Sequence, residues 1–305
     1  MTCSPVSAFN KILVTGSNGV VGRHFCSRYG GIPLVDLRGR VDVRDPQRVS
    51  AAIASLLPDA VVHLAAQSSV AASFEDPRTT FEINFLGTFN LLQALAQSGF
   101  QGTLLYVGSA DVYGRTAGSE LPTKETQPLR PRSPYAVSKV AAEALCYQWS
   151  QQQNFRVVLA RPFNQIGPGQ RTRFAVADFA LQIARIAKGK QEPSLITGDL
   201  DVTRDFTDVR DAVRACRMLL EKGENGEIYN LCSGEERSLR SIVDRLLQIE
   251  GIQVELKIDP SRLRPAEQRR GVGDPTKLQS HTGWTPEIDF QATLQDILTE
   301  AKEIA

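Results

Sequence analysis

A short apolar run near the N-terminus leads directly into a glycine-rich turn, and this pairing limits the possible folds more than any other feature. Residues 11–15 read KILVT and residues 16–22 read GSNGVVG. A buried strand, a glycine turn and a helix in this order are typical of a nucleotide-binding sheet. Gly16 would permit the tight turn, Gly19 would let backbone N–H groups approach a pyrophosphate, and Gly22 would let the helix pack closely. The helix N-terminus would add partial positive charge. A plain surface turn is the alternative.

The composition is that of a globular protein without a strong electrostatic bias. The 305 residues are 42% hydrophobic and 23% charged, enough for one large domain or two intertwined ones. With 35 basic and 34 acidic residues, we expect neither nucleic acid nor an anionic membrane as a partner. The five cysteines contain no CxxC pair, so we expect no disulfide framework and no metal. The N-terminus lacks signal-peptide features and no apolar run approaches the ~20 residues of a membrane span, so we expect a cytoplasmic protein.

The second expected strand, residues 32–36, bears on the choice of cofactor. Asp36 would accept hydrogen bonds from an adenosine ribose, whereas Arg38 would meet a 2′-phosphate. The two residues favour NADH and NADPH respectively, so the choice stays open. Residues 60–66 (AVVHLAA) form a further apolar strand, whose small residues would let a cofactor lie against the backbone.

Tyr135 and Lys139 stand four residues apart in a segment that favours a helix. If residues 135–150 are helical, as their Ala, Leu, Lys and Glu content predicts, both side chains project from one face. The ammonium would then lower the tyrosine pKa from its usual value of about 10 and make Tyr135 a proton donor or acceptor. Such pairs also occur by chance on solvated helices. Ser109, at the carboxyl end of an expected strand at 103–108, would complete the set.

Three segments carry a resemblance to a known family. Residues 109–114 (SADVYG), 133–139 (SPYAVSK) and 161–170 (RPFNQIGPGQ), with the GxxGxxG spacing, resemble the extended short-chain dehydrogenase/reductases that modify nucleotide sugars. The likeness runs almost end to end. In that family the serine bonds the reacting oxygen, the tyrosine transfers its proton, and the lysine binds the nicotinamide ribose and lowers the tyrosine pKa. The matching residues are Ser109, Tyr135 and Lys139.

The resemblance implies an α/β fold: a modified Rossmann, doubly wound parallel sheet with a smaller, interleaved C-terminal substrate domain. The NAD(P)-binding domain would comprise residues 1–163 plus about 206–231, and the nucleotide-sugar domain about 164–205 plus 232–305. The family also places an acid beside the adenine. Here Asp42 and Val43 would close a third strand at that position, although an aspartate that only forms a turn is an equal alternative. The residues expected to bind NADPH or NADH are Gly16, Asn18, Gly19, Val20, Gly22, Asp36, Arg38, Asp42, Val43, Leu64, Ala65, Ala66, Tyr135 and Lys139.

The second half of the chain would select the substrate. Residues 204–209 (RDFTDV) and 262–267 (RLRPAE) resemble the nucleotide-sugar site of GDP-mannose dehydratases and their partner reductases. Arg204 and Arg264 would clamp a diphosphate with their guanidinium forks, and Glu267 would accept from ribose hydroxyls. Surface charge is the alternative for either arginine. The resemblance adds an asparagine that bonds the sugar diphosphate. The expected substrate-binding residues are Ser109, Asp111, Asn164, Arg204, Arg264 and Glu267.

The pattern is most similar to the reductases of GDP-4-keto-6-deoxy-D-mannose that form GDP-D-rhamnose. This likeness implies hydride transfer from NADPH or NADH to the 4-keto carbon. The related 4,6-dehydratases hold a glutamate where this chain has Asp111. The aspartate is one methylene shorter, and moving a base by about 1 Å costs on the order of 100-fold in rate, so dehydration is disfavoured. A 4,6-dehydratase, a 4-epimerase and a non-catalytic cofactor-sensing protein remain the alternatives, and a loop acid bonded to backbone is the preferred interpretation of Asp111.

The helix expected at 81–96 suggests an assembly. One apolar stripe comprises Phe81, Phe85, Phe89, Leu92 and Leu95, while Ile83, Leu86 and Leu91 lie off it. One face would pack on the sheet and the other would need cover, as would the apolar remainder of the helix at 135–150. In the extended short-chain family these two helices form a four-helix dimer interface, so we expect a homodimer.

Overall fold

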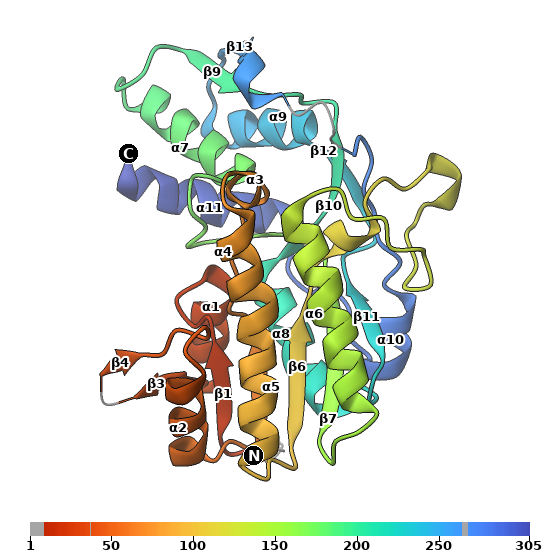
Figure 1. Cartoon of the computed structure of the whole chain (residues 1–305). Coiled ribbons are helices and arrows are strands. Elements are labelled where there is room, and N and C mark those ends of the chain that lie inside the picture. The colour runs from red at the N-terminus through yellow and green to blue at the C-terminus, as the bar shows by residue number, and fades with distance from the viewer. Residues whose placement is uncertain (1–8, 37, 264–267) are drawn as a thin grey trace, which may run out of the picture.

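The computed structural model describes residues 9–36, 38–263 and 268–305. Figure 1 shows a parallel sheet flanked by helices in the lower part of the molecule and a smaller group of helices and strands above it. Arg264 and Glu267, which are predicted to bind the substrate, lie outside the described residues.

The main sheet has six strands, all parallel. In spatial order they are β11 (Ile228–Leu231), β7 (Arg156–Pro162), β6 (Thr103–Val107), β5 (Ala60–His63), β1 (Ile12–Thr15) and β2 (Ile32–Pro33). From β1 the chain moves one way to β2 and the other way to β5. Ligands bind at such a switch point, beyond the carboxyl ends of the strands. The prediction of a doubly wound parallel α/β sheet is confirmed.

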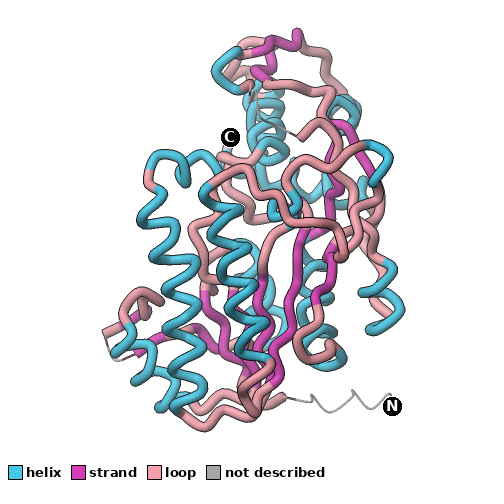
Figure 2. Tube along the Cα trace, turned by 45° about the vertical axis from the view of Figure 1, so that its right-hand side comes forward, coloured by secondary structure: helices cyan, strands magenta, loops and turns pink. Residues whose placement is uncertain are grey.

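Helices cover both faces of this sheet, and alternate strand residues explain why (Figure 2). Ile12 and Val14 point into one core and Leu13 into the other, as the two-residue period of a strand requires. The first core is shared with α1 (Val20–Tyr29), α8 (Val209–Lys222) and α10 (Thr276–Thr282). The second is shared with α2 (Pro46–Leu56), α5 (Gly87–Gln97) and α6 (Pro134–Ser150).

The upper part of the molecule has its own core. One small sheet has the strand order β12 (Glu236–Ser238), β10 (Thr203–Asp208), β8 (Asn164–Ile166). A second one pairs β13 (Glu255–Ile258) with β9 (Ser194–Thr197). Three helices share their core, namely α7 (Ala175–Ala187), α9 (Leu239–Glu250) and α11 (Phe290–Ile304). The chain passes between the two parts repeatedly, because β8 follows β7 directly and β10 leads into α8. The domain boundaries themselves stay a prediction.

The expected second and third strands are wrong in their extent. The main-sheet strand β2 ends at Pro33, and β3 (Val35–Asp36) pairs instead with β4 (Gly39–Arg40) in a separate antiparallel hairpin. Pro33 has no N–H for a ladder, and Gly39, at φ 100°, lets the chain reverse. Residues 42 and 43 belong to no strand and lie just before α2.

The helical segment at 77–97 contains a π turn. It runs through α4 (Pro77–Phe81), the π turn η1 (Glu82–Leu86) and α5, preceded by α3 (Val70–Glu75). Beyond the turn the predicted stripe is right for Leu92 and Leu95, which are fully buried, and wrong for Phe89, which is exposed, while Leu91 is also fully buried. A π turn carries one residue more than an α turn, which rotates every later side chain about the axis.

Two further findings concern the described residues. Among their helices, none combines the length and apolar character that crossing a bilayer requires. Within the same ranges, no three His, Cys, Asp or Glu side chains converge as a set of metal ligands would. The remaining short elements are the 3-10 turns η2 (Ala110–Tyr113), η3 (Gly118–Glu120) and η4 (Pro260–Arg262).

Candidate active site

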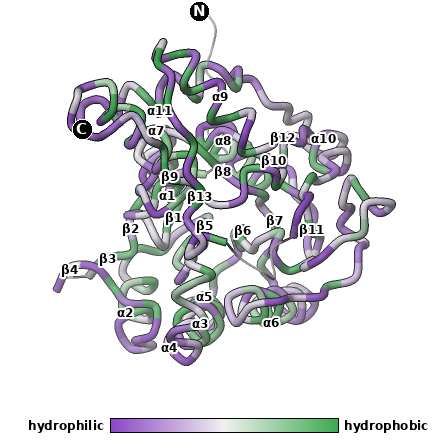
Figure 3. The backbone as a smooth tube through the Cα atoms, turned by 90° about the horizontal axis from the view of Figure 1, so that it is seen from above, coloured by the Kyte–Doolittle hydropathy of each residue, from purple (hydrophilic) through white to green (hydrophobic). Residues whose placement is uncertain are grey.

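The glycine turn forms one wall of a cleft at the switch point between β1 and β5, which lie side by side in the view from above (Figure 3). Gly16 has φ +68°, and a Cβ there would stand 2.7 Å from the backbone N of Ala65. A Cβ at Gly22 would stand 2.4 Å from the Gly16 oxygen. Both positions therefore require glycine. Gly19 is the N-cap of α1, so the positive end of that helix faces the turn.

These features fit a dinucleotide, since a glycine-lined turn and a helix N-terminus can approach a pyrophosphate closely. The residues that line the cleft are Thr15, Gly16, Ser17, Asn18, Leu34, Arg40, Val41, Asp42, Val43, Ala65, Ala66 and Ile83. Six of the expected cofactor residues are in this set. Gly19, Val20, Gly22 and Leu64 lie in or directly beside the same turns.

The far end of the cleft carries several charges. The carboxylate of Asp42 is paired with Arg44 at 2.6 Å, and this hydrogen bond lowers the pKa of Asp42. Arg40, which the sequence analysis did not single out, lines the cleft. Arg38 is exposed on the β3–β4 hairpin, and the side chain of Asp36 lies outside what the structure describes.

Ser109, Tyr135 and Lys139 come together beyond the carboxyl end of β6. Their exposed fractions are 8%, 7% and 4%. Ser109 lies two residues after the end of β6 and caps η2, accepting from the Asp111 N–H at 3.2 Å. Helix α6 begins at Pro134, after Ser133 has capped it through the Ala136 N–H. One helical turn separates the phenol from the ammonium, whose Nζ donates to the Val107 oxygen at 2.9 Å.

The acidity of the pair differs from the expectation. Burial raises the pKa of Tyr135, the charge of Asp111 raises it further, and a hydrogen bond with Ser109 opposes them. The expected lowering by Lys139 is wrong, because desolvation of the phenolate and the charge of Asp111 together outweigh the hydrogen bond from Ser109. Burial also lowers the pKa of Lys139 to about 8. At neutral pH the site therefore holds a protonated phenol beside a mostly charged ammonium.

A buried chain of hydrogen bonds, which the sequence analysis missed, links the glycine turn to helix α6. The Thr15 hydroxyl accepts from the N–H groups of Leu64 and Ala65, so its own proton goes to Nδ1 of His63 at 2.7 Å. The other ring nitrogen, Nε2, therefore carries the hydrogen and donates to the Thr88 hydroxyl at 2.9 Å. Burial and the charge of Lys139 lower the pKa of His63 to about 3, which keeps the ring neutral.

The chain continues through the π turn. The Thr88 hydroxyl donates to the backbone oxygen of Asn84 at 2.7 Å, and the side-chain amide of Asn84 donates to the Ser138 hydroxyl at 2.9 Å. Ser138 in turn donates to the backbone oxygen of Tyr135 at 2.6 Å. Asn84 also holds the loop after β5, through both backbone groups of Gln67. The π turn thus connects the cofactor side of the cleft with the helix that carries Tyr135 and Lys139.

The expected substrate residues are only partly brought together. Asn164 and Arg204 lie on the neighbouring strands β8 and β10, where Asn164 is paired with Phe206. Asn164 is exposed, and Arg204 is half-buried with Nη1 donating to the Thr203 oxygen at 2.7 Å. Asp111 is exposed in η2, close enough to Tyr135 to raise its pKa.

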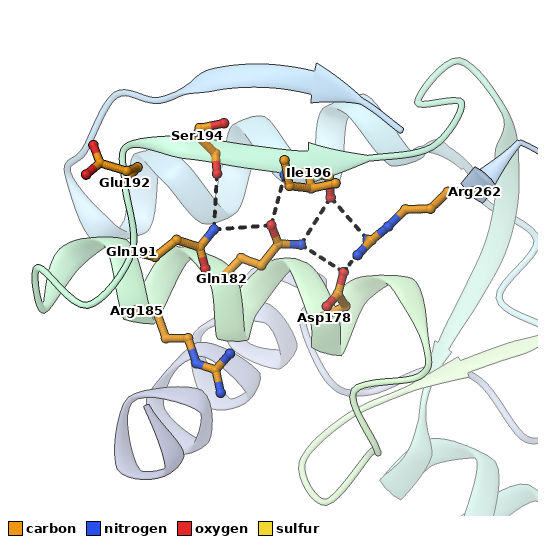
Figure 4. A pocket seen from close by; sticks show the side chains of 8 residues that line it. All are labelled: Asp178, Gln182, Arg185, Gln191, Glu192, Ser194, Ile196 and Arg262. Carbon is orange, nitrogen blue, oxygen red and sulfur yellow. Dashed lines mark hydrogen bonds and ion pairs between the residues drawn. The ribbon is translucent and has the colours of Figure 1, made fainter. Parts of the chain in front are cut away.

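A second pocket, in the upper part of the molecule, shares no residue with the glycine-lined cleft (Figure 4). Several of its polar side chains already form hydrogen bonds or ion pairs within the pocket. Gln182 bonds both backbone groups of Ile196, and Asp178 pairs with Arg262 at 2.6 Å. None of the expected site residues lines it.

The parallel sheet, the glycine-lined cleft and the Ser109, Tyr135 and Lys139 set define a short-chain dehydrogenase/reductase. The model of the GDP-mannose 4,6 dehydratase family matches residues 38–297. The chain belongs to this family.

Individual relatives agree with this assignment. The chain is 46% identical to the GDP-6-deoxy-D-mannose reductase of Pseudomonas aeruginosa, over 95% of this chain and 96% of that protein. A GDP-mannose 4,6-dehydratase of Vibrio cholerae is 30% identical, over 87% of this chain and 78% of that protein.

Solved structures show the same fold. The structure of RMD from Pseudomonas aeruginosa complexed with NADPH has a TM-score of 0.91 and 43% identity, and the match covers 97% of this chain and 100% of that one. The UDP-glucose 4-epimerase of Thermus thermophilus in complex with NAD has a TM-score of 0.84 and 31% identity, with 97% and 100% covered.

Proposed function

We propose that the chain is an NADPH-dependent oxidoreductase that reduces the 4-keto group of GDP-4-keto-6-deoxy-D-mannose to give GDP-D-rhamnose. The observation that carries the proposal is the Tyr135 phenol, hydrogen-bonded to Ser109, at the end of β6. The neighbouring strand β5 leads into Ala65 and Ala66, which line the glycine-rich cleft. The likeness to the Pseudomonas aeruginosa reductase supplies the substrate class. A cofactor domain and a substrate domain with the predicted boundaries are part of the same proposal.

The side chains divide the reaction between them. When bound, the reduced nicotinamide supplies the hydride. Tyr135 donates its proton to the oxygen that becomes the alcohol, and the raised pKa keeps this proton in place until negative charge develops on that oxygen. Ser109 orients the same oxygen by a hydrogen bond, and Lys139 holds the ribose and stabilises the phenolate left behind. Asn164, Arg204 and Arg264 hold the sugar diphosphate, and Glu267 accepts hydrogen bonds from ribose hydroxyls.

The charges at the far end of the cleft support NADPH over NADH. A 2′-phosphate is disfavoured by a nearby carboxylate and favoured by arginine. Arg44 neutralises Asp42, and Arg40 lines the cleft beside them. Arg38 lies on the same hairpin and adds a further positive charge.

The assembly and the location belong to the proposal as well. We expect a homodimer through the helices at 81–96 and 135–150, because Phe89 and Val137 are exposed on the outer side of α5 and α6. We place the protein in the cytoplasm, without a nucleic-acid or membrane partner. The near balance of 35 basic and 34 acidic residues supports the absence of a polyanionic partner.

Product analysis tests the reaction. The protein is incubated with the 4-keto intermediate and either NADPH or NADH, and the sugar formed is identified by NMR. We expect GDP-D-rhamnose with oxidation of NADPH. In a separate incubation with GDP-mannose and no added cofactor, consumption of the sugar would instead indicate a 4,6-dehydratase. Interconversion of C4 epimers without net oxidation would indicate a 4-epimerase. No hydride transfer with either cofactor would favour the cofactor-sensing alternative.

Tyr135→Phe tests the proton donor. The substitution removes the hydroxyl and keeps the ring, so we expect kcat to fall by about 10²–10⁴-fold, the usual contribution of a general acid. The Kd for NADPH, measured by fluorescence titration, should change by less than about threefold. A variant that keeps wild-type turnover would exclude Tyr135 as the donor.

A further inference from the structure

Arg23, on the first turn of α1, joins two loops that are far apart in the sequence. Its Nη1 donates to the backbone oxygen of Asn18 at 2.8 Å, and its Nη2 donates to the backbone oxygen of Gly169 at 2.7 Å. Asn18 belongs to the glycine turn and lines the cofactor cleft. Gly169 belongs to the loop that follows β8, the strand on which Asn164 lies. One rigid, planar guanidinium therefore bridges the glycine turn of the cofactor cleft and the loop that follows the strand of Asn164.

The loop at 167–170 is held on several sides. His24, the next residue of α1, bonds the Pro168 oxygen at 2.9 Å, and Glu300 of α11 accepts from the Gly169 N–H at 2.6 Å. Gly169 has φ +81°, and a Cβ there would stand only 2.9 Å from Nη2 of Arg23. The position of this loop is thus set by α1 on one side and by α11 on the other.

A second contact crosses between the same two sides. Arg173, a few residues further along the chain, donates to the Ser68 hydroxyl at 3.3 Å, and Ser68 lies in the loop after β5. The loop and the strand before it also hold unused hydrogen-bonding capacity. Among the described residues, the buried Nε2 of Gln165 in β8 and Oε1 of Gln170 have no partner.

We propose that Arg23 is a positioning residue that couples the binding of the two ligands. The inference rests on the proposed function, because it takes the ligands to be a nicotinamide dinucleotide and a nucleoside diphosphate sugar. A dinucleotide that settles the glycine turn fixes the Asn18 carbonyl, and the guanidinium passes this constraint to the Gly169 carbonyl. Occupancy of one site then raises affinity at the other, and linkage requires the effect to be reciprocal.

Binding measurements test the coupling without turnover. The Kd for GDP is measured by isothermal titration calorimetry without cofactor and with saturating NADP⁺, and the ratio of the two constants is the coupling factor. For the wild type we expect a factor of about 5 or more, the lower end of usual allosteric couplings. Arg23→Met keeps the aliphatic stem and loses every donor, so its factor should fall close to 1. Arg23→Lys has one ammonium in place of the fork and should fall between them.

Arg28→Ala is the matched control, since Arg28 lies on the same helix and contacts the ring of Tyr29 rather than either loop. It should keep the wild-type factor. If Arg23 were only a structural tether, Arg23→Met would bind GDP more weakly both without and with NADP⁺, and the ratio of the two Kd values would not change. That result would overturn the inference. So would a wild-type factor of 1. If Arg23→Met does not fold, an unchanged factor in Arg23→Lys has the same force. Absence of GDP binding to the wild type would overturn the proposed substrate, and this inference with it.

Discussion

The charge of Lys139 is the feature of the site most exposed to pH. Burial lowers its pKa to about 8, from 10.5, so the ammonium is present below pH 8 and is lost as the pH rises through that value. Since kcat/KM for NADPH reports ionisations of the free protein, we expect it to be flat near neutrality and to fall above about pH 8. Lys139→Arg, which stays charged, should lower the rate but remove this alkaline limb. An unchanged limb in that variant would assign it to another group.

His63 makes a different prediction, about stability. Its pKa is about 3 in the folded protein and 6.5 as the reference for the unfolded chain, so the unfolded state binds the proton first as the pH falls. Stability is therefore full above pH 6.5 and is lost below it, by about 2 kcal/mol at pH 5 from this group alone. Urea unfolding at pH 7 and pH 5 measures the loss. His63→Gln, although less stable, should lose about 2 kcal/mol less between the two pH values; equal losses would contradict the assignment.

At the residue scale, local spacing placed the chemistry and tertiary burial decided its strength. The four-residue interval between Tyr135 and Lys139 is visible in any helix-forming segment, and Ser109 follows an obvious strand. The direction of the Tyr135 pKa could not be predicted, because it depends on desolvation by segments distant in the sequence. Thr88 carries no local signal either, since its role exists only once β5 and α5 are adjacent.

At the scale of elements, the positions of the main helices and strands could be predicted from the sequence, but their irregularities could not. A π turn has no strong sequence signature, and just beyond it Phe89 is exposed and Leu91 is buried, contrary to the predicted stripe. The β3–β4 hairpin was missed for a similar reason, because residues 32–36 are apolar enough for one strand and only Pro33 and Gly39 hint at the break. Both irregularities border the cofactor cleft, where Leu34, Arg40 and Ile83 line it.

The π turn is held in place by Thr88, and this can be tested. Thr88→Val keeps the shape but leaves the buried Nε2–H of His63 without its acceptor. Leaving a buried polar group unsatisfied costs about 1–3 kcal/mol in the free energy of unfolding. Thr88→Ser keeps the hydroxyl and loses one methyl, about 1 kcal/mol. We expect urea unfolding to show the valine variant as the less stable of the two, and the reverse order would exclude the hydrogen-bonded chain as a support.

At the scale of the whole molecule, one motif and the order of elements were enough for the architecture. The GxxGxxG turn after a buried strand implies a parallel sheet with helices on both faces, and both cores are observed. The passage of the chain between the two parts was anticipated only through family resemblance, since periodicity cannot show which strand joins which sheet. Strand β8, for example, is separated from the end of β7 by one residue, yet it pairs with β10 instead of joining the main sheet.

The outer side of α5 and α6 leads to the last prediction, which concerns assembly. Phe89, Val137 and Tyr147 are 37%, 41% and 52% exposed there, on two helices whose inner sides already cover the sheet. Homodimer interfaces are apolar at their centre, and an unpaired charge buried there is strongly unfavourable. In sedimentation velocity at micromolar concentration we expect a dimer for the wild type and a monomer for Phe89→Glu/Val137→Glu. Ile258→Glu, at an exposed position on β13, is the control and should remain dimeric. Val137 lies between Tyr135 and Lys139 on α6, so the monomeric variant should also lose activity. A wild type that sediments as a monomer would exclude this interface.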